Sequence, residues 1–116
     1  MLKHLAHRGA LLELLQFERP FPELRSSILA FPYDYDGDPV VLTRNHLAHV
    51  LQCVVDGTIS EQELEAWSEL IEGRPGIEYE SGMESRLSEI LFQLSTPEIN
   101  EPVTVEKCWR LLKDLR

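Results

Sequence analysis

The feature that most constrains the fold is the repeated spacing of apolar residues by three and four positions, which is the period of an amphipathic helix. It occurs in six segments, each bounded by proline, glycine or a residue that caps helices. The expected helices cover residues 2–17, 22–31, 43–55, 60–72, 81–96 and 104–116. The sequence therefore predicts an all-α fold, a small bundle of five or six short helices.

Capping residues indicate where several helices begin. Thr43 is a predicted N-cap, and Ser60 with Glu63 and Ser81 with Glu84 have the spacing of the capping box. The side chains expected in the core are Leu47, Val50, Leu51, Val54, Leu64, Trp67, Ile71, Leu87, Ile90, Leu91, Leu94, Val105, Cys108, Trp109, Leu112 and Leu115.

Two short segments have the period of a strand instead. Residues 40–42 are aliphatic and mostly β-branched, and residues 77–80 alternate apolar and acidic side chains. Each is long enough only for a short strand, so we expect at most a minimal two-stranded pairing between them.

Length and charge limit the class of protein. The chain has 116 residues, enough for one packed core, and carries 11 basic against 20 acidic residues for a net charge of -9. Nucleic acids and anionic membranes would repel it. The charged start does not resemble a signal peptide, and no window is apolar enough to span a membrane. We expect a cytoplasmic protein whose two cysteines, Cys53 and Cys108, are free thiols.

An acidic stripe is the feature most open to a functional interpretation. Four glutamates share one face of the helix at 60–72, within about 80° of one another, where like charges repel. The stripe can simply keep the protein dispersed, or it can dock a basic protein surface. The predicted partner-binding residues are Glu61, Glu65, Glu69, Glu72, Glu78 and Glu80.

His46, His49 and Cys53 lie within about 60° of one another on the helix at 43–55, so they are candidate metal ligands. The candidates for a fourth ligand are Cys108, His4 and His7. No spacing predicts that these residues meet. The alternative places Cys53 at the border of the apolar stripe and both histidines at its wet margin, and we expect neither a metal nor a cofactor.

Other chemistry has little support. The segment Asp56–Glu63 resembles half of an EF-hand loop, but Val54 falls at a ligand position. The aspartate-rich turn at residues 33–39 lacks the bidentate glutamate of a calcium site. The chain also has no G-x-S-x-G, no phosphate-cradling glycine loop and no C-x-x-C, so no enzyme is predicted.

Five short motifs follow one another along the chain: Leu42-Thr43-Arg44, Gly57-x-Ile59-Ser60-x-x-Glu63-Leu64-x-x-Trp67, Glu72-Gly73-Arg74, Ile77-x-Tyr79-Glu80 and Pro97-Glu98-Ile99-Asn100. Together they resemble a set of small, mostly uncharacterised bacterial proteins and, more distantly, the helical colicin-type immunity proteins. The resemblance implies one domain over residues 1–116, with a variable helical extension at 1–31 and the core bundle at 32–116. It also implies an acidic protein that blocks the cationic active site of a cognate toxin, although no inhibitory motif carries over residue by residue.

The predicted function is protein binding without catalysis, as an immunity-type inhibitor of a basic partner. One alternative is a homo-oligomeric structural or regulatory domain, with a homodimer formed through the leucine-rich helix at 2–17. The other is a metal-binding sensor or enzyme that uses His46, His49 and Cys53.

Overall fold

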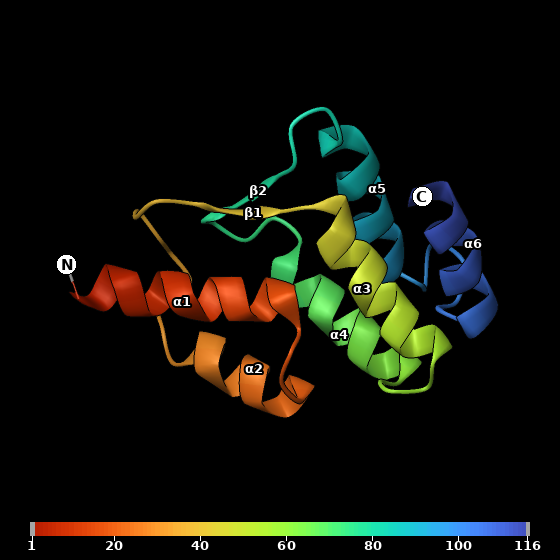
Figure 1. Ribbon diagram of the computed structural model, residues 1–116, viewed down its shortest axis with the longest axis horizontal. Coiled ribbons are helices and arrows are strands. Elements are labelled where there is room, and N and C mark those ends of the chain that lie inside the picture. Colours follow the sequence, from red (N-terminus) through yellow and green to blue (C-terminus); the bar gives the residue numbers. More distant parts are fainter. Residues whose placement is uncertain (1, 116) are drawn as a thin grey trace.

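The computed structural model describes residues 2–115, with side chains from residue 5 onward, and in this part of the chain it shows six helices and one two-stranded sheet (Figure 1). The predicted helical bundle with a minimal strand pairing is confirmed. The elements are α1 (Leu2–Gln16), α2 (Phe21–Leu29), β1 (Val40–Leu42), α3 (Arg44–Val55), α4 (Glu61–Ile71), β2 (Ile77–Tyr79), α5 (Glu84–Ser95) and α6 (Val105–Leu115).

The helices are arranged along an axis of 43 Å. In Figure 1, α1 and α2 lie side by side at one end, α6 lies at the other end, and α3, α4 and α5 lie between them. None of the helices in residues 2–115 has both the length and the apolar character that crossing a bilayer requires.

The starts of α3 and α4 follow the sequence. Thr43 accepts a hydrogen bond from the backbone N–H of His46, and Nδ1 of His46 accepts the N–H of Thr43 at 3.0 Å. Ser60 and Glu63 form the reciprocal pair at the start of α4, at 3.0 and 3.1 Å. Each pair satisfies two backbone donors that would otherwise lack partners at a helix start.

The predicted capping box at Ser81 is wrong. α5 begins at Glu84, and Met83 occupies the N-cap position without a side-chain cap. The carboxylate of Glu84 accepts the N–H of Gly82 at 2.8 Å instead. Gly82 has a φ of +85°, a left-handed conformation that the first turn of a right-handed helix does not contain, so the helix starts later.

One core joins α1 to the later helices. Trp67 of α4 is fully buried, and its Nε1 donates to the carbonyl of Leu14 in α1 at 2.8 Å. The ring of Phe17 meets Trp67 edge-on, with centroids 6.2 Å apart. The segment 1–31, expected as an extension, thus contributes residues between Ala10 and Ile28 to the same core as the later helices. Its variation among relatives stays a prediction.

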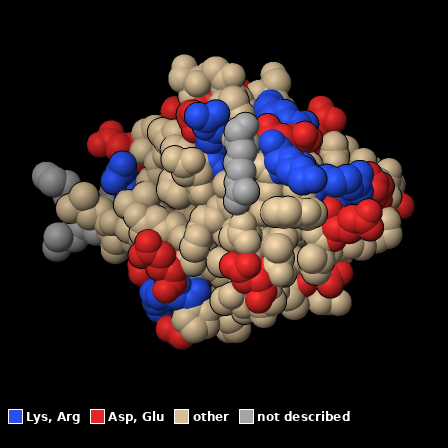
Figure 2. Space-filling view, turned by 45° about the vertical axis from the view of Figure 1, so that its right-hand side comes forward, with Lys and Arg blue, Asp and Glu red and all other residues tan. Residues whose placement is uncertain are grey.

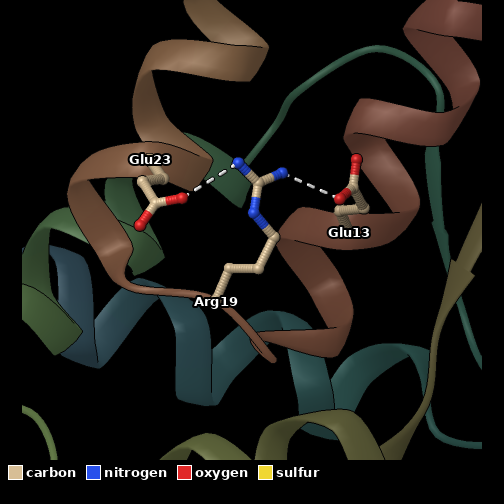
Figure 3. Close-up of polar contacts among 3 residues, drawn as sticks. All are labelled: Glu13, Arg19 and Glu23. Atoms are coloured by element: carbon tan, nitrogen blue, oxygen red, sulfur yellow. Dashed lines mark hydrogen bonds and ion pairs between the residues drawn. The ribbon is translucent and has the colours of Figure 1, made fainter.

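A single arginine connects α1 to α2 across the link between them. Arg19 donates through Nη1 to Glu13 of α1 at 2.9 Å and through Nη2 to Glu23 of α2 at 3.2 Å (Figure 3). Pro22 lies in the first turn of α2, as predicted, because that position needs no amide donor. Both ion pairs are exposed, so each contributes little to stability.

The two strands are parallel. Their pairs in register are Val40–Ile77, Val41–Glu78 and Leu42–Tyr79. Parallel pairing requires a long crossover, and α3 and α4 supply it by carrying the chain from the end of β1 to the start of β2.

The inward face of α6 differs from the prediction. Val105 and Trp109 are each 43% exposed, although both were expected in the core. Cys108, Leu112 and Leu115 are buried as predicted, and Leu111, which was not predicted, is buried with them. Leu111 follows Cys108 by three positions and Leu115 follows by four more, so these residues share a face from which Trp109 is turned by about 100°.

Candidate protein-binding face

Four glutamates define the α4 acidic face: Glu61, Glu65, Glu69 and Glu72. The first three lie within α4, and Glu72 is its C-cap residue. Glu69 is exposed and the other three are half-buried, so the carboxylates flank the apolar stripe that the helix buries. Spacings of four, four and three keep all four on one side of the helix.

No lysine or arginine among the described residues lies within ion-pair distance of these four carboxylates. Arg74 is the nearest basic residue in the sequence, but its guanidinium lies 5.0 Å from the ring centroid of Tyr33 and donates through Nε to the carbonyl of Leu70. Burial lowers the pKa of this guanidinium. Arg74 therefore does not neutralise the α4 acidic face.

The charge of the face affects neighbours at both of its ends. Burial raises the pKa of the Cys108 thiol in α6 to about 11, and the negative charge of Glu61 adds to the shift. Burial likewise raises the pKa of Tyr79 in β2, with a contribution from Glu72. A carboxylate disfavours a second negative charge close by, so these effects place the two ends of the face near α6 and near β2.

An open groove adjoins the β2 end of the face, and we call it the α4–α5 groove. It has a volume of about 840 Å³ and is lined by Glu72, Gly73, Tyr79, Ser85, Ser88, Glu89 and Phe92. Phe92 is 44% exposed and Tyr79 is half-buried. The groove therefore combines two aromatic rings with the carboxylates of Glu72 and Glu89.

Glu78 and Glu80 lie in and just after β2 and do not extend the helix face. Oε1 of Glu80 accepts the backbone N–H of Arg44 at 2.9 Å, so this carboxylate is engaged at the start of α3. Glu78 is exposed opposite Val41. Because side chains alternate along a strand, it points to the side opposite Tyr79. The four glutamates of the α4 acidic face are thus grouped, and these two are set apart.

The structure brings two of the candidate metal ligands of α3 together, His49 and Cys53, and engages the third, His46, in the helix cap. His46 uses Nδ1 in the cap of α3, and burial lowers its pKa. Nε2 of His49 lies 3.9 Å from Sγ of Cys53 and 3.3 Å from the carbonyl oxygen of Phe17. Among the residues that the structure describes, no three His, Cys, Asp or Glu side chains are placed to hold a metal ion, and this includes the aspartate-rich turn at 33–39.

The residues considered for a fourth ligand lie elsewhere. Cys108 is buried in α6, and His7 is buried in α1, where it stacks on Phe31 with ring centroids 4.8 Å apart. The side chain of His4 lies outside the described residues.

His49 and Cys53 have the residue types of a base and a nucleophile, and both line a groove of about 550 Å³. Burial raises the pKa of the Cys53 thiol, and Asp56 adds to the shift. A thiol with a raised pKa stays protonated at neutral pH, whereas a nucleophile needs the thiolate. The arrangement gives no support to an activated cysteine.

Three of the six leucines of α1 are unavailable for a homodimer. Leu11, Leu14 and Leu15 are fully buried in the core of their own chain. Leu5 is 64% exposed, and the side chain of Leu2 lies outside the described residues. Leu12 is half-buried. Among the described side chains, the homo-oligomeric alternative therefore depends on the small apolar surface that Leu5 and part of Leu12 provide.

Sequence reasoning missed two exposed aromatic residues. Phe92 directly follows the inward residue Leu91 and is turned by about 100° from it, so the helical period already indicates exposure. Trp109 has the same offset from Cys108, but its size favoured a place in the core. The spacing of Leu111 from Cys108 and Leu115 is the signal that could have shown which face of α6 is buried.

The sequence was compared with protein-family models and with curated proteins, and the fold was compared with solved structures. The resemblance to helical immunity proteins stays a prediction, because none of the three comparisons found a match.

Proposed function

We propose that this protein acts without catalysis, by binding a basic protein partner through the α4 acidic face as an inhibitor of the immunity type. The observation that carries the proposal is a set of four carboxylates on one helix side with no counter-charge among the described residues. Each like-charge pair at these spacings costs about 0.2–0.5 kcal/mol. A cationic partner would remove this cost.

The position of the charges along α4 supports the same proposal. Glu61 lies in the first turn, where the helix dipole favours negative charge, and the capping box accounts for Glu63. Glu69 and Glu72 lie at the carboxyl end, where the dipole disfavours negative charge. Local helix stability therefore does not explain the second pair.

The α4–α5 groove adds an anchor to the charge. Binding energy at protein interfaces is concentrated in a few buried aromatic and arginine residues. An arginine or lysine of the partner that enters this groove would meet the carboxylates of Glu72 and Glu89, and its cation would lie near the rings of Tyr79 and Phe92. If the cationic active site of the partner lay over this groove, binding would bury these four side chains and cover that active site.

The folded helix favours tight binding of such a partner, and binding would inhibit it. The carboxylates are fixed on a folded scaffold, so little conformational entropy is lost on binding. Complementary charge speeds association, and the effect weakens as salt rises because the screening length is about 10 Å at 0.1 M. Substrate would then be excluded by occupation of the partner's cationic site.

The test compares two variants of equal net charge. The first carries Glu61→Gln, Glu65→Gln, Glu69→Gln and Glu72→Gln, and the control carries Glu18→Gln, Asp34→Asn, Glu98→Gln and Glu106→Gln at exposed positions. Proteins captured from the host at about 50 and about 200 mM salt would be identified, purified and titrated with each variant.

We expect the wild type and the control to bind the same basic protein in a salt-sensitive way. The first variant should bind it at least about tenfold more weakly. Capture of acidic proteins only, or equal affinity of the two variants, would overturn the proposal.

A homodimer through α1 is the competing function, and exposed Leu5 is the observation that favours it. Light scattering of the wild type and of Leu5→Ser separates the two. A dimer that dissociates on this substitution would support self-association, and a wild-type monomer at all concentrations would remove it. Deleting α1 is a poorer test, because Leu14 belongs to the core.

A further inference from the structure

Another groove, between α5 and α6, carries charge opposite to that of the α4 acidic face, and we call it the α5–α6 groove. It has a volume of about 370 Å³, and its charged lining residues are Arg86, Lys107, Arg110, Lys113, Glu101 and Asp114. Four basic and two acidic side chains leave an excess of two positive charges, in a chain whose net charge is -9. Figure 2 shows the side of the molecule that includes α6, where basic side chains lie beside acidic ones.

The two arginines of this groove are already paired. Nη2 of Arg86 lies 2.7 Å from a carboxylate oxygen of Asp114, and Nη2 of Arg110 lies 2.9 Å from one of Glu101. A guanidinium has five donors in a planar fork, so each arginine has further N–H groups beyond those in its ion pair. The excess positive charge therefore belongs to the two lysines.

Lys107 is the unusual member of the group. It is only 3% exposed, and its Nζ donates to the backbone carbonyl of Glu101 at 3.4 Å, the long end of the hydrogen-bond range. Within the described part of the chain, no carboxylate lies within ion-pair distance of this ammonium. An ammonium has three donors, and burying its charge without a close ion pair is costly.

The helix dipole does not explain Lys107 either. Lys113 lies in the last turn of α6, where the dipole favours a cation. Lys107 lies near the start of the same helix, where the dipole disfavours a cation and favours an anion. The carboxylate of Glu101 acts on Lys107 only from beyond ion-pair distance. Burial, the lack of a close ion pair and the dipole all indicate that an anion belongs beside Lys107.

We propose that the α5–α6 groove binds a small dianionic oxyanion of the phosphate class, with Lys107 and Lys113 as its counter-charges. Two negative charges match the excess of two positive charges, and the free N–H groups of Arg86 and Arg110 suit the several oxygens of a phosphate. A nucleic-acid backbone is disfavoured as the ligand, because the net charge of -9 would repel it. This site is separate from the α4 acidic face, so either proposal can fail without the other.

The test titrates the wild type with inorganic phosphate at constant ionic strength and follows backbone amide shifts. We expect saturable shifts in α6 and a rise in Tm that follows the same binding curve. Lys107→Met keeps the apolar stem and should weaken binding about tenfold or more, while raising Tm without phosphate because the unpaired buried charge is gone. Lys113→Gln, at an exposed position, should weaken binding less.

Arg25→Gln is the matched control, because it removes one exposed positive charge from α2. It should leave phosphate binding unchanged. A nucleoside monophosphate and acetate complete the series. Tighter binding of the nucleotide would identify a phosphate ester as the ligand, and equal binding would identify the phosphate group alone. Acetate binding as tight as phosphate, or a non-saturating response that Lys107→Met leaves intact, would overturn the proposal.

Discussion

The helices α4 and α6 are both rich in charged side chains, but they differ in whether those side chains form ion pairs. On α6, Arg110 pairs with Glu101 and Asp114 pairs with Arg86. On α4, the glutamates of the acidic face have no cationic partner among the described residues. Paired charges support the fold, and repelling charges oppose it. The comparison teaches that charge density alone does not reveal function, because two charge-rich helices differ in how their charges are paired. The proposed partner rests on the unpaired charges of α4.

The same two helices also differ in their tryptophans. Trp67 of α4 is fully buried and donates a hydrogen bond to Leu14, whereas Trp109 of α6 is 43% exposed and carries the ammonium of Lys113 at 5.5 Å from its ring centroid. One ring holds helices together, and the other covers surface. Burial therefore decides the role of each ring, since the residue type is the same.

The largest expected effect on stability tests the comparison of the two tryptophans. Trp67→Ala should lower the free energy of unfolding by about 3–5 kcal/mol, because it leaves a cavity and removes the hydrogen bond to the Leu14 carbonyl. Trp109→Ala should cost less than about 1 kcal/mol, because the ring is partly in solvent. Urea unfolding followed by circular dichroism measures both. Equal losses would mean that the inward face of α6 is assigned wrongly.

The second effect concerns the thiol of Cys108 in α6, which interacts electrostatically with Glu61 of α4. Its pKa is raised from 9.0 to about 11, first by burial and then by Glu61. Below pH 9 the thiol is protonated in both states, so its contribution is fully present. Between pH 9 and 11 the unfolded state loses the proton and the folded state keeps it, so stability falls by about 2 kcal/mol as pH rises.

Urea unfolding at about pH 8 and about pH 10.5 measures this loss, with Cys108→Ala as the reference for all other titrating groups. The wild type should lose more stability than Cys108→Ala over this interval. Glu61→Gln should reduce the difference, because it removes the nearby negative charge. A difference that does not depend on pH would contradict the raised pKa.

The parts of the fold that depend on near neighbours in the sequence could be predicted. The start of α4 follows from Ser60 and Glu63, which bind each other's backbone within one turn. Ser81 and Glu84 have the same spacing, but the left-handed turn at Gly82 displaces the helix start. Spacing alone cannot show which backbone conformation a glycine adopts.

The parts that depend on distant residues could not be predicted. The α4–α5 groove joins Glu72 to Phe92, and the α5–α6 groove joins Arg86 to Lys107. No period in the sequence relates these residues, because only the packing of the helices brings them together. The acidic stripe could be predicted as a helix face. Its lack of counter-charge could not, because it depends on the guanidinium of Arg74 lying over the ring of Tyr33.

The third effect sharpens the contrast between the two capping signals. Ser60→Ala should cost about 1 kcal/mol, because the N–H of Glu63 loses the acceptor that Ser60 Oγ provides at 3.0 Å. Ser81→Ala should change stability by less than about 0.5 kcal/mol, since its side chain caps no helix. Thermal unfolding of both variants measures the difference. A comparable loss at Ser81 would restore the predicted capping box.

The smallest effect tests the comparison of α4 with α6 directly. Glu65→Gln should raise the free energy of unfolding by about 0.4–1 kcal/mol, because it removes two repelling pairs, those of Glu65 with Glu61 and with Glu69. Asp114→Asn should lower it by at most about 1 kcal/mol, because it removes the acceptor of Arg86. Unfolding at low and at high salt measures both, and the two differences should have opposite signs and shrink together as salt screens the charges.

Opposite signs are the decisive outcome, since both substitutions remove one negative charge from a chain of net charge -9. If relief of the overall negative charge were the whole effect, both variants would be stabilised by similar amounts. A gain on α4 with a loss on α6 requires that the local partners matter more than the total. A loss at Glu65 would mean that the α4 carboxylates already stabilise the fold, and the reason for assigning them to a partner would be gone.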